Sequence, residues 1–183
     1  MTEKVLFITD TFENLNFKKD TSILMIEEAL KKEMDVFQCE INDLFVDNND
    51  VLVNCRKINS LSEDIDTEVK KIDIDLKDFK YCFMRKDPPV DEDYNNALHL
   101  LNLAKHNGAV IHNNPCALKK FNEKVFATHF PEFIPKTLIS SSINKIRAFF
   151  DSQKKIIIKP LDGMGGTSIY KVCLLYTSPS PRD

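Results

Sequence analysis

Residues 156–168 combine a strand-forming run, a lysine and three glycines: Ile-Ile-Ile-Lys-Pro-Leu-Asp-Gly-Met-Gly-Gly-Thr-Ser. The isoleucines predict a strand that ends at Lys159, followed by a glycine-rich turn into a second strand. Backbone N–H groups without a neighbouring Cβ can approach an oxyanion such as phosphate, and Lys159 adds positive charge. Gly163, Gly165 and Gly166 are three of only four glycines in the chain. Their concentration here indicates a need for backbone freedom.

The glycine pattern alone leaves two interpretations open. It is not a Walker A loop, because no Gly-Lys-Ser or Gly-Lys-Thr ends it. It is not G-x-G-x-x-G either, since the third glycine is missing and no helix is expected next. A strand–loop–strand that clasps nucleotide phosphates and an ordinary hairpin loop both remain possible.

Composition limits the classes of partner. The chain has 183 residues, 43% apolar and 29% charged, which predicts one globular domain or one plus part of another. A net charge of −3 argues against nonspecific binding to nucleic acid or to a membrane surface. No apolar run approaches the roughly 20 residues that a bilayer requires. Five dispersed cysteines argue against a disulfide framework or a zinc ribbon, so we expect a cytoplasmic protein.

Strands and helices alternate in the first part of the chain. An alternation of this kind predicts an α/β fold with an open, mostly parallel sheet. Ligands of such sheets bind outside the carboxyl ends of the strands, where this sequence places polar residues from Asp10 onward, at 85–87 and at Asn113. Ordinary polar loops would give the same pattern. The predicted strands are 4–9, 35–41, 81–84 and 109–112, the helices are 21–33 and 91–107, and a hairpin turns at 47–50.

A second α+β unit is expected after Pro115. Its predicted elements are a helix over 116–130, a strand over 137–140, a helix over 143–150 and strands over 154–159 and 168–172. Residues 60–78 keep helical spacing and then alternate with acids, which favours a solvated helix and an edge segment.

Four motifs occur together in a characteristic order and spacing. As a set they closely resemble the bacterial glutathione synthetase family of ATP-grasp ligases, over about residues 4–172. They are Asn-Phe-Lys-Lys-Asp-Thr-Ser from residue 16, Met-Arg-Lys-Asp-Pro-Pro from residue 84, Asn-Glu-Lys from residue 122 and Lys-Pro-Leu-Asp-Gly-Met-Gly-Gly from residue 159.

The resemblance implies a pre-ATP-grasp domain over residues 1–115 and the start of an ATP-grasp domain over 116–172, cut short. Lys124 and Lys159 would match the two lysines that hold the ATP phosphates. Gly163, Met164, Gly165 and Gly166 would match the flexible loop that closes over them, with Lys159, Gly165 and Gly166 also serving catalysis. Residues 173–183 depart from the family pattern, and we expect a non-native tail there.

The implied reaction joins γ-glutamylcysteine to glycine with ATP hydrolysis to ADP and phosphate. An acyl phosphate would form on the cysteinyl carboxylate, and the glycine amine would displace phosphate. Lysines, backbone N–H groups and magnesium would neutralise charge. The family's magnesium ligands lie beyond position 172, so this stretch alone is expected to be inactive. Complete copies are expected to form a homo-oligomer.

The polar N-terminal loops are the candidates for binding the peptide substrate. An arginine can hold a carboxylate through two hydrogen bonds. An internal salt bridge between Arg85 and Asp87 is an equally good explanation of that pair. The candidate residues are Asn16, Lys18, Asp20, Ser22, Arg85 and Asp87.

Two other functions stay open. One is a different ATP-grasp ligase that joins other carboxylates and amines, against which the motif at residues 84–89 argues. The other is a noncatalytic binding module formed by the first domain, which the missing metal ligands favour and the retained Lys124 and Lys159 oppose.

Overall fold

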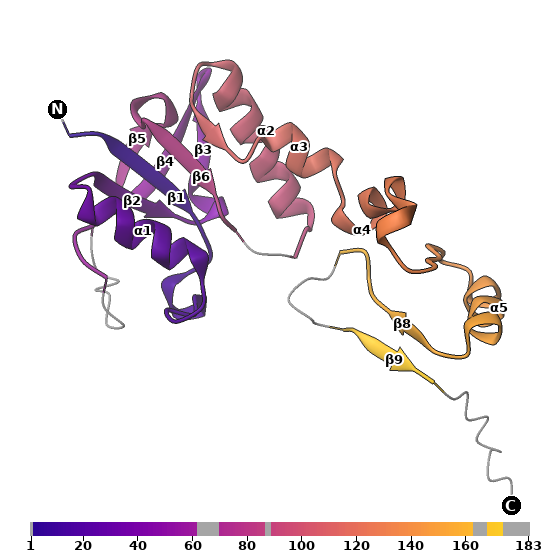
Figure 1. Ribbon diagram of the computed structural model, residues 1–183. Helices are drawn as coiled ribbons and strands as arrows, with labels where there is room; N and C mark the ends of the chain where they lie inside the picture. The colour runs from indigo at the N-terminus through magenta and orange to yellow at the C-terminus, as the bar shows by residue number, and fades with distance from the viewer. Residues whose placement is uncertain (1, 62–69, 87–88, 163–167, 174–183) are drawn as a thin grey trace, which may run out of the picture. The chain divides into compact units, whose positions relative to one another are not determined.

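The computed structural model describes residues 2–61, 70–86, 89–162 and 168–173. The chain divides into two compact units, Met1–Lys120 and Phe121–Asp183 (Figure 1). Each unit is described separately below.

Seven strands of the first unit form one sheet, in the order β3-β4-β2-β1-β6-β7 with β5 beside β4. β2, β1, β6 and β7 run parallel, whereas β4 pairs antiparallel with β2, β3 and β5. The parallel part agrees with the predicted open sheet, and the antiparallel extension grows from the predicted hairpin. The strands are β1 (Lys4–Ile8), β2 (Asp35–Cys39), β3 (Leu44–Asp47), β4 (Asp50–Ile58), β5 (Ile72–Asp75), β6 (Tyr81–Met84) and β7 (Ile111–His112).

β1 lies inside the sheet and is buried on both faces. Its side chains from Val5 to Ile8 are at most 1% exposed. Leu6 pairs with Phe37 of β2 on one side and with Cys82 of β6 on the other. A continuous apolar run is typical of such a strand, and each large side chain contributes roughly 1.5–3 kcal/mol by leaving water.

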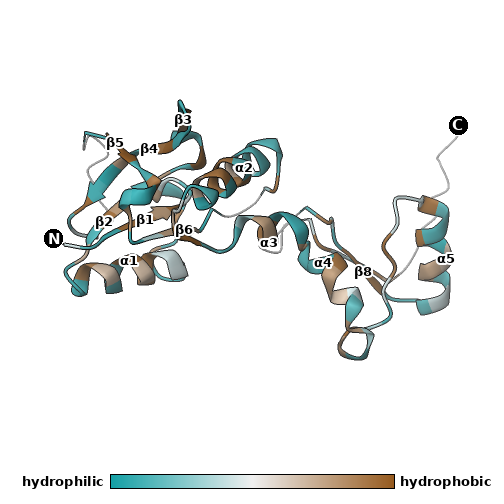
Figure 2. Cartoon of the chain, turned by 90° about the horizontal axis from the view of Figure 1, so that it is seen from above, coloured by the Kyte–Doolittle hydropathy of each residue, from teal (hydrophilic) through white to brown (hydrophobic). Residues whose placement is uncertain are grey.

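Two helices cover opposite faces of this sheet (Figure 2). α1 (Thr21–Lys31) packs Ile23 and Ile26 against Val5 and Phe7. α2 (Glu92–His106) packs Leu98 and Leu101 against Leu6 and Ile8. Successive strand residues point to opposite faces, so β1 contributes to both cores.

Aspartates begin both helices. Asp20 Oδ1 accepts a hydrogen bond from Ser22 N at 2.7 Å, and Asp91 Oδ1 accepts one from Tyr94 N at 2.9 Å. These N-caps confirm where the sequence predicted the helices to start. No helix in the described ranges has the length and apolar character needed to cross a bilayer.

Short 3-10 turns and small helices complete the architecture. α3 follows β7 and ends the first unit, where it packs against α2. The second unit contains α4, α5 and the antiparallel pair β8–β9, in which Ile157 pairs with Lys171. The bounds are η1 (Phe12–Asn14), η2 (Ile41–Asp43), η3 (Leu76–Asp78), α3 (Pro115–Lys120), α4 (Glu123–Phe126), η4 (Ala127–His129), η5 (Pro131–Phe133), α5 (Ile143–Gln153), β8 (Ile156–Ile158) and β9 (Tyr170–Val172).

Two predictions for the second half of the chain were wrong. The single helix over 116–130 is divided between α3, α4 and η4, because Asn122 caps a new helix by accepting hydrogen bonds from the backbone N of Lys124 and Val125. Residues 137–140 have no regular structure. A strand needs a hydrogen-bonded neighbour, and no strand of the described residues pairs with them.

The second unit has almost no core of its own. Phe150 is the one apolar side chain that is buried among the described residues after Lys120. Phe133 is 81% exposed, and Ile157 and Tyr170 are each 62% exposed. The free energy gained by burying so little apolar surface does not offset the conformational entropy that the segment loses on folding.

We therefore predict that residues 1–120 fold cooperatively alone. Their melting temperature should match that of the 183-residue chain within about 4 °C, because the second unit adds little buried apolar area. Thermal unfolding followed by circular dichroism measures this. A cooperative transition of residues 121–183 alone, or a collapse of residues 1–120, would contradict it.

The cysteines give a second prediction. Burial raises the pKa of Cys55 and of Cys82 to about 12, and raises that of Cys39 well above its ordinary value. Cys116 and Cys173 are exposed. Because the thiolate is the reactive form, a disulfide reagent at pH 8 should modify two thiols quickly and the other three only on unfolding. Fast reaction of any buried cysteine in the folded chain would refute this assignment.

Candidate functional site

The carboxyl ends of β1 and β6 lie at the same edge of the sheet. The two strands are parallel neighbours, and Ile8 pairs with Met84. Asp10 follows β1, and Arg85 and Lys86 follow β6, so opposite charges meet there. Lys86 Nζ lies 2.8 Å from Asp10 Oδ1, with the side chains 15% and 24% exposed.

Arg85 connects this edge to the start of α1. Its Nη2 donates to Thr21 Oγ1 at 2.6 Å, and its Nε faces Ser22 Oγ at 3.3 Å. Within the described part of the chain, no carboxylate forms an ion pair with Arg85. Both observed partners are neutral hydroxyls, which orient the guanidinium without pairing it with a negative charge.

A tight turn precedes α1 and carries three of the predicted residues. Asn16 Oδ1 accepts from Lys18 N at 3.1 Å, and the Asn16 carbonyl accepts from Asp20 N at 2.8 Å. Asp20 then caps α1. Asn16 and Lys18 themselves are exposed.

The structure thus brings Asp20, Ser22 and Arg85 together at one edge, with Asn16 and Lys18 on the adjoining turn. Asp87 lies outside the described residues. The sequence analysis placed Asp10 and residues 85–87 at the ends of parallel strands, but it did not name Thr21, Asp10 or Lys86 as candidate site residues. The signal was present, because Asp10 and Lys86 each follow a predicted parallel strand with opposite charge.

In the second unit, Lys124 lies beside the segment that follows β8. Asn122 Nδ2 donates to the Leu161 carbonyl at 3.0 Å, and Lys124 Nζ donates to the same carbonyl at 3.4 Å. Lys124 Nζ also lies 3.3 Å from Glu123 Oε1, and its side chain is 19% exposed. Two segments 37 residues apart therefore meet at one carbonyl.

Lys159 is exposed at the end of β8, two positions before Leu161. The structure thereby places both predicted phosphate-binding lysines in one unit, next to the same short segment. Gly163, Met164, Gly165 and Gly166 lie outside the described residues.

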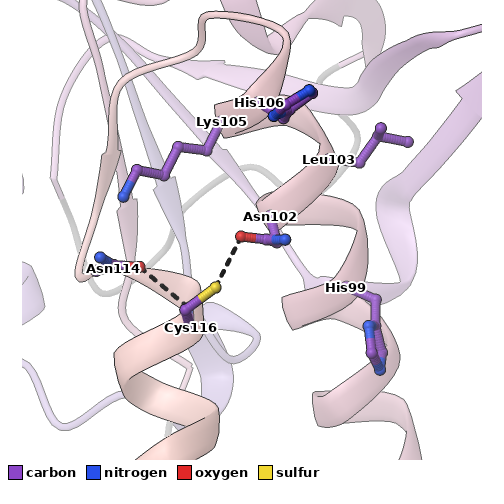
Figure 3. Close-up of a pocket in the computed structure, with 7 residues that line it drawn as sticks. All are labelled: His99, Asn102, Leu103, Lys105, His106, Asn114 and Cys116. Carbon is purple, nitrogen blue, oxygen red and sulfur yellow. Dashed lines mark hydrogen bonds between the residues drawn. The ribbon is translucent and has the colours of Figure 1, made fainter.

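A hollow of about 560 Å³ lies elsewhere, between α2 and α3 (Figure 3). Cys116 Sγ faces Asn102 Oδ1 there at 3.0 Å, and Asn114 Oδ1 accepts from Cys116 N at 3.1 Å. None of the predicted site residues lines it. A second hollow, of about 360 Å³, is lined by the turn that carries Asn16 and Lys18.

The described residues do not fit a magnesium site. Within the ranges that the structure describes, no group of three or more His, Cys, Asp and Glu side chains could hold a metal ion.

Comparison with known families agrees with this arrangement of two units. Residues 4–119 match the prokaryotic glutathione synthetase N-terminal domain, and residues 123–176 match the prokaryotic glutathione synthetase ATP-grasp domain. The chain belongs to the prokaryotic glutathione synthetase family. The fold class and the family resemblance predicted from the sequence are confirmed.

Curated relatives named glutathione synthetase match nearly the whole chain. The protein of Buchnera aphidicola subsp. Baizongia pistaciae is 37% identical over 175 residues, covering 94% of this chain and 54% of the relative. That of Yersinia pestis is 38% identical over 172 residues, and that of Escherichia coli K12 is 35% identical over 171 residues. Each covers 92% of this chain and 54% of the relative.

The chain spans about half the length of the curated relatives it matches. The domain boundary at 115–116 and the non-native tail over 173–183 stay predictions. The ATP-grasp match runs to residue 176, and residues 174–183 lie outside the described part of the chain.

The contacts of Arg85 with the start of α1 should contribute to the stability of the first unit. Arg85→Ala should lower the free energy of unfolding by about 1 kcal/mol, because two hydrogen bonds to a half-exposed cation are lost. Denaturant unfolding of the single variants and of the Arg85→Ala, Thr21→Val pair gives the coupling energy, expected near 0.5–1 kcal/mol. Lys19→Ala, an exposed lysine of the same turn, is the matched control. Purely additive effects would show that the Arg85–Thr21 contact contributes nothing.

Proposed function

We propose that this chain forms the N-terminal half of a ligase that joins γ-glutamylcysteine to glycine, with ATP converted to ADP and phosphate. Membership of the glutathione synthetase family supports the reaction class. The contact of Asn122 and Lys124 with the Leu161 carbonyl is the single observation that carries the nucleotide site, because it brings Lys124 next to the Lys159 segment.

The two lysines would act on the phosphates of ATP. Several negative charges on the triphosphate need fixed positive partners, and a preorganised lysine supplies one without reorganisation during the reaction. Lys124 is mostly buried and held by Glu123 and the Leu161 carbonyl, whereas Lys159 is exposed. We propose that Lys124 holds the phosphates in a fixed orientation, whereas the side chain of Lys159 moves with the phosphates. Residues 163–166 would close over them and exclude water from the acyl phosphate.

The peptide substrate would bind at the edge formed by β1, β6 and the start of α1. γ-Glutamylcysteine carries two carboxylates and one ammonium group. Arg85, whose described partners are hydroxyls, would hold a carboxylate, with Ser22 beside it. Asn16, Lys18 and Asp20 would contact the rest of the peptide from the turn, and Asp87 belongs to the same proposal.

Two further parts of the proposal rest on the family alone. They are magnesium held by ligands beyond this chain and assembly of complete copies into a homo-oligomer. Action in the cytoplasm is supported by the free thiols of all the described cysteines, which are compatible with a reducing compartment.

A full-length polypeptide tests the function. Residues 1–172 joined to the second half of the Yersinia pestis relative should form glutathione from γ-glutamylcysteine, glycine and ATP. In that polypeptide, Lys159→Ala should lower kcat/KM by roughly 30- to 900-fold, because one preorganised positive charge is lost from the transition state. Coupled measurement of ADP release and glutathione by mass spectrometry follows the reaction.

Lys155→Ala is the matched control, since Lys155 is an exposed lysine just before the same strand. It should leave kcat/KM within threefold of the parent. A Lys159→Ala variant as active as the control would remove Lys159 from the nucleotide site.

A further inference from the structure

Arg56 is a buried cation of the first unit that neither proposed site uses. It lies on β4 directly opposite Gln38 of β2, and only 6% of its surface is exposed. A buried guanidinium needs partners that replace the water it has lost. Among the described residues it contacts the Gln38 amide and the ring of Phe12, and its charge also acts on the carboxylate of Glu13 in the loop after β1.

The first contact sets the direction of a hydrogen-bond chain. Arg56 Nε donates to Gln38 Oε1 at 2.7 Å. Because a guanidinium only donates, the amide must turn its oxygen to Arg56 and its NH2 group away. Gln38 Nε2 then donates to Thr9 Oγ1 at 3.1 Å and to the Cys39 carbonyl at 3.0 Å. Thr9 Oγ1 in turn donates to the Asp10 carbonyl at 2.7 Å.

The second contact reaches the loop that follows β1. The guanidinium carbon of Arg56 lies 5.1 Å from the centroid of the Phe12 ring, within the range of a cation–π interaction. Phe12 is 3% exposed, and its ring lies 6.4 Å from that of Phe17. Phe12 and Phe17 line the second hollow described above, together with Asn16 and Lys18.

We propose that Arg56 is a positioning residue for residues 10–20, the loop between β1 and α1. It fixes the Asp10 carbonyl through Gln38 and Thr9, and it fixes the beginning of the loop through Phe12. The geometry of Asn16 and Lys18 then depends on a cation that lies on another strand. That the loop serves a peptide substrate rests on the proposed function, but the control of the loop by Arg56 does not.

Limited trypsin digestion of the 183-residue chain tests this proposal. The loop contains two trypsin sites, after Lys18 and after Lys19, and cleavage there requires the loop to open. The variant is Arg56→Met, which keeps an unbranched apolar stem and removes the guanidinium with its donors and charge. Lys57→Met is the matched control, because Lys57 is the next residue, is 47% exposed and pairs with Asp35 at the surface.

Cleavage after Lys31 and Lys32, which are exposed at the end of α1 and lie outside the loop, provides the internal reference. Arg56→Met should accelerate cleavage after Lys18 and Lys19 by roughly tenfold relative to that reference, because a hydrogen bond to a charged group is lost locally. Lys57→Met should leave this ratio unchanged. Equal acceleration at all sites would show a merely structural role and overturn the proposal, as would no acceleration.

If Arg56→Met fails to fold, Arg56→Lys takes its place. It keeps the positive charge and loses the planar fork, so the same selectivity for Lys18 and Lys19 is expected with a smaller acceleration. Uniform or absent acceleration in this variant overturns the proposal in the same way.

A separate arm adds γ-glutamylcysteine to the parent chain. Slower cleavage after Lys18 and Lys19 would support the peptide site on this loop. Unchanged cleavage would contradict the proposed peptide site alone, because the rates without the peptide already decide the role of Arg56.

Discussion

The parallel pairing of β1 with both β2 and β6 is the constraint on which the first unit depends. A strand with neighbours on both sides and helices on both faces must be apolar throughout, and residues 5–8 are buried almost completely. Since parallel strands end at one edge, this pairing also brings Asp10, after β1, next to Lys86, after β6. The strand that supplies the core therefore also fixes the position of the polar edge.

The polar edge is connected by contacts that neutralise some charges and leave others available. Asp10 pairs with Lys86, and Asp20 is engaged by the backbone of α1. Arg85 is held only by hydroxyls of the described residues, which orient it without cancelling its charge. An arginine oriented in this way loses little conformational freedom when it binds a carboxylate.

The second unit is not organised around a buried core. Among its described residues almost no apolar side chain is buried, and local hydrogen bonds hold its segments together. Asn122 both caps α4 and donates to the Leu161 carbonyl, so one side chain links the helix to the segment after β8. A unit of this kind depends on further packing for its stability.

Features that depend on neighbouring residues can be predicted from this sequence, whereas features that depend on contacts between distant residues cannot. The buried strand at residues 4–8 and the helices capped by Asp20 and Asp91 follow from hydrophobic period and capping, so their prediction is confirmed. The break at Asn122 went unpredicted, because a capping residue inside an apolar periodic stretch looks like a helix residue. The strand predicted for residues 137–140 is absent, since a strand forms only where a second strand, distant in the sequence, pairs with it. The contacts of Arg85 with Thr21 and Ser22 join residues more than 60 positions apart, which local spacing does not encode.

Hydrogen–deuterium exchange of the full-length polypeptide, with and without saturating γ-glutamylcysteine, shows whether the peptide binds where β1 and β6 end and α1 begins. Binding there should slow exchange in segments 15–24 and 84–86 and leave α2 unaffected. Slower exchange confined to α2 and the hollow around Cys116, with residues 15–24 unchanged, would contradict it.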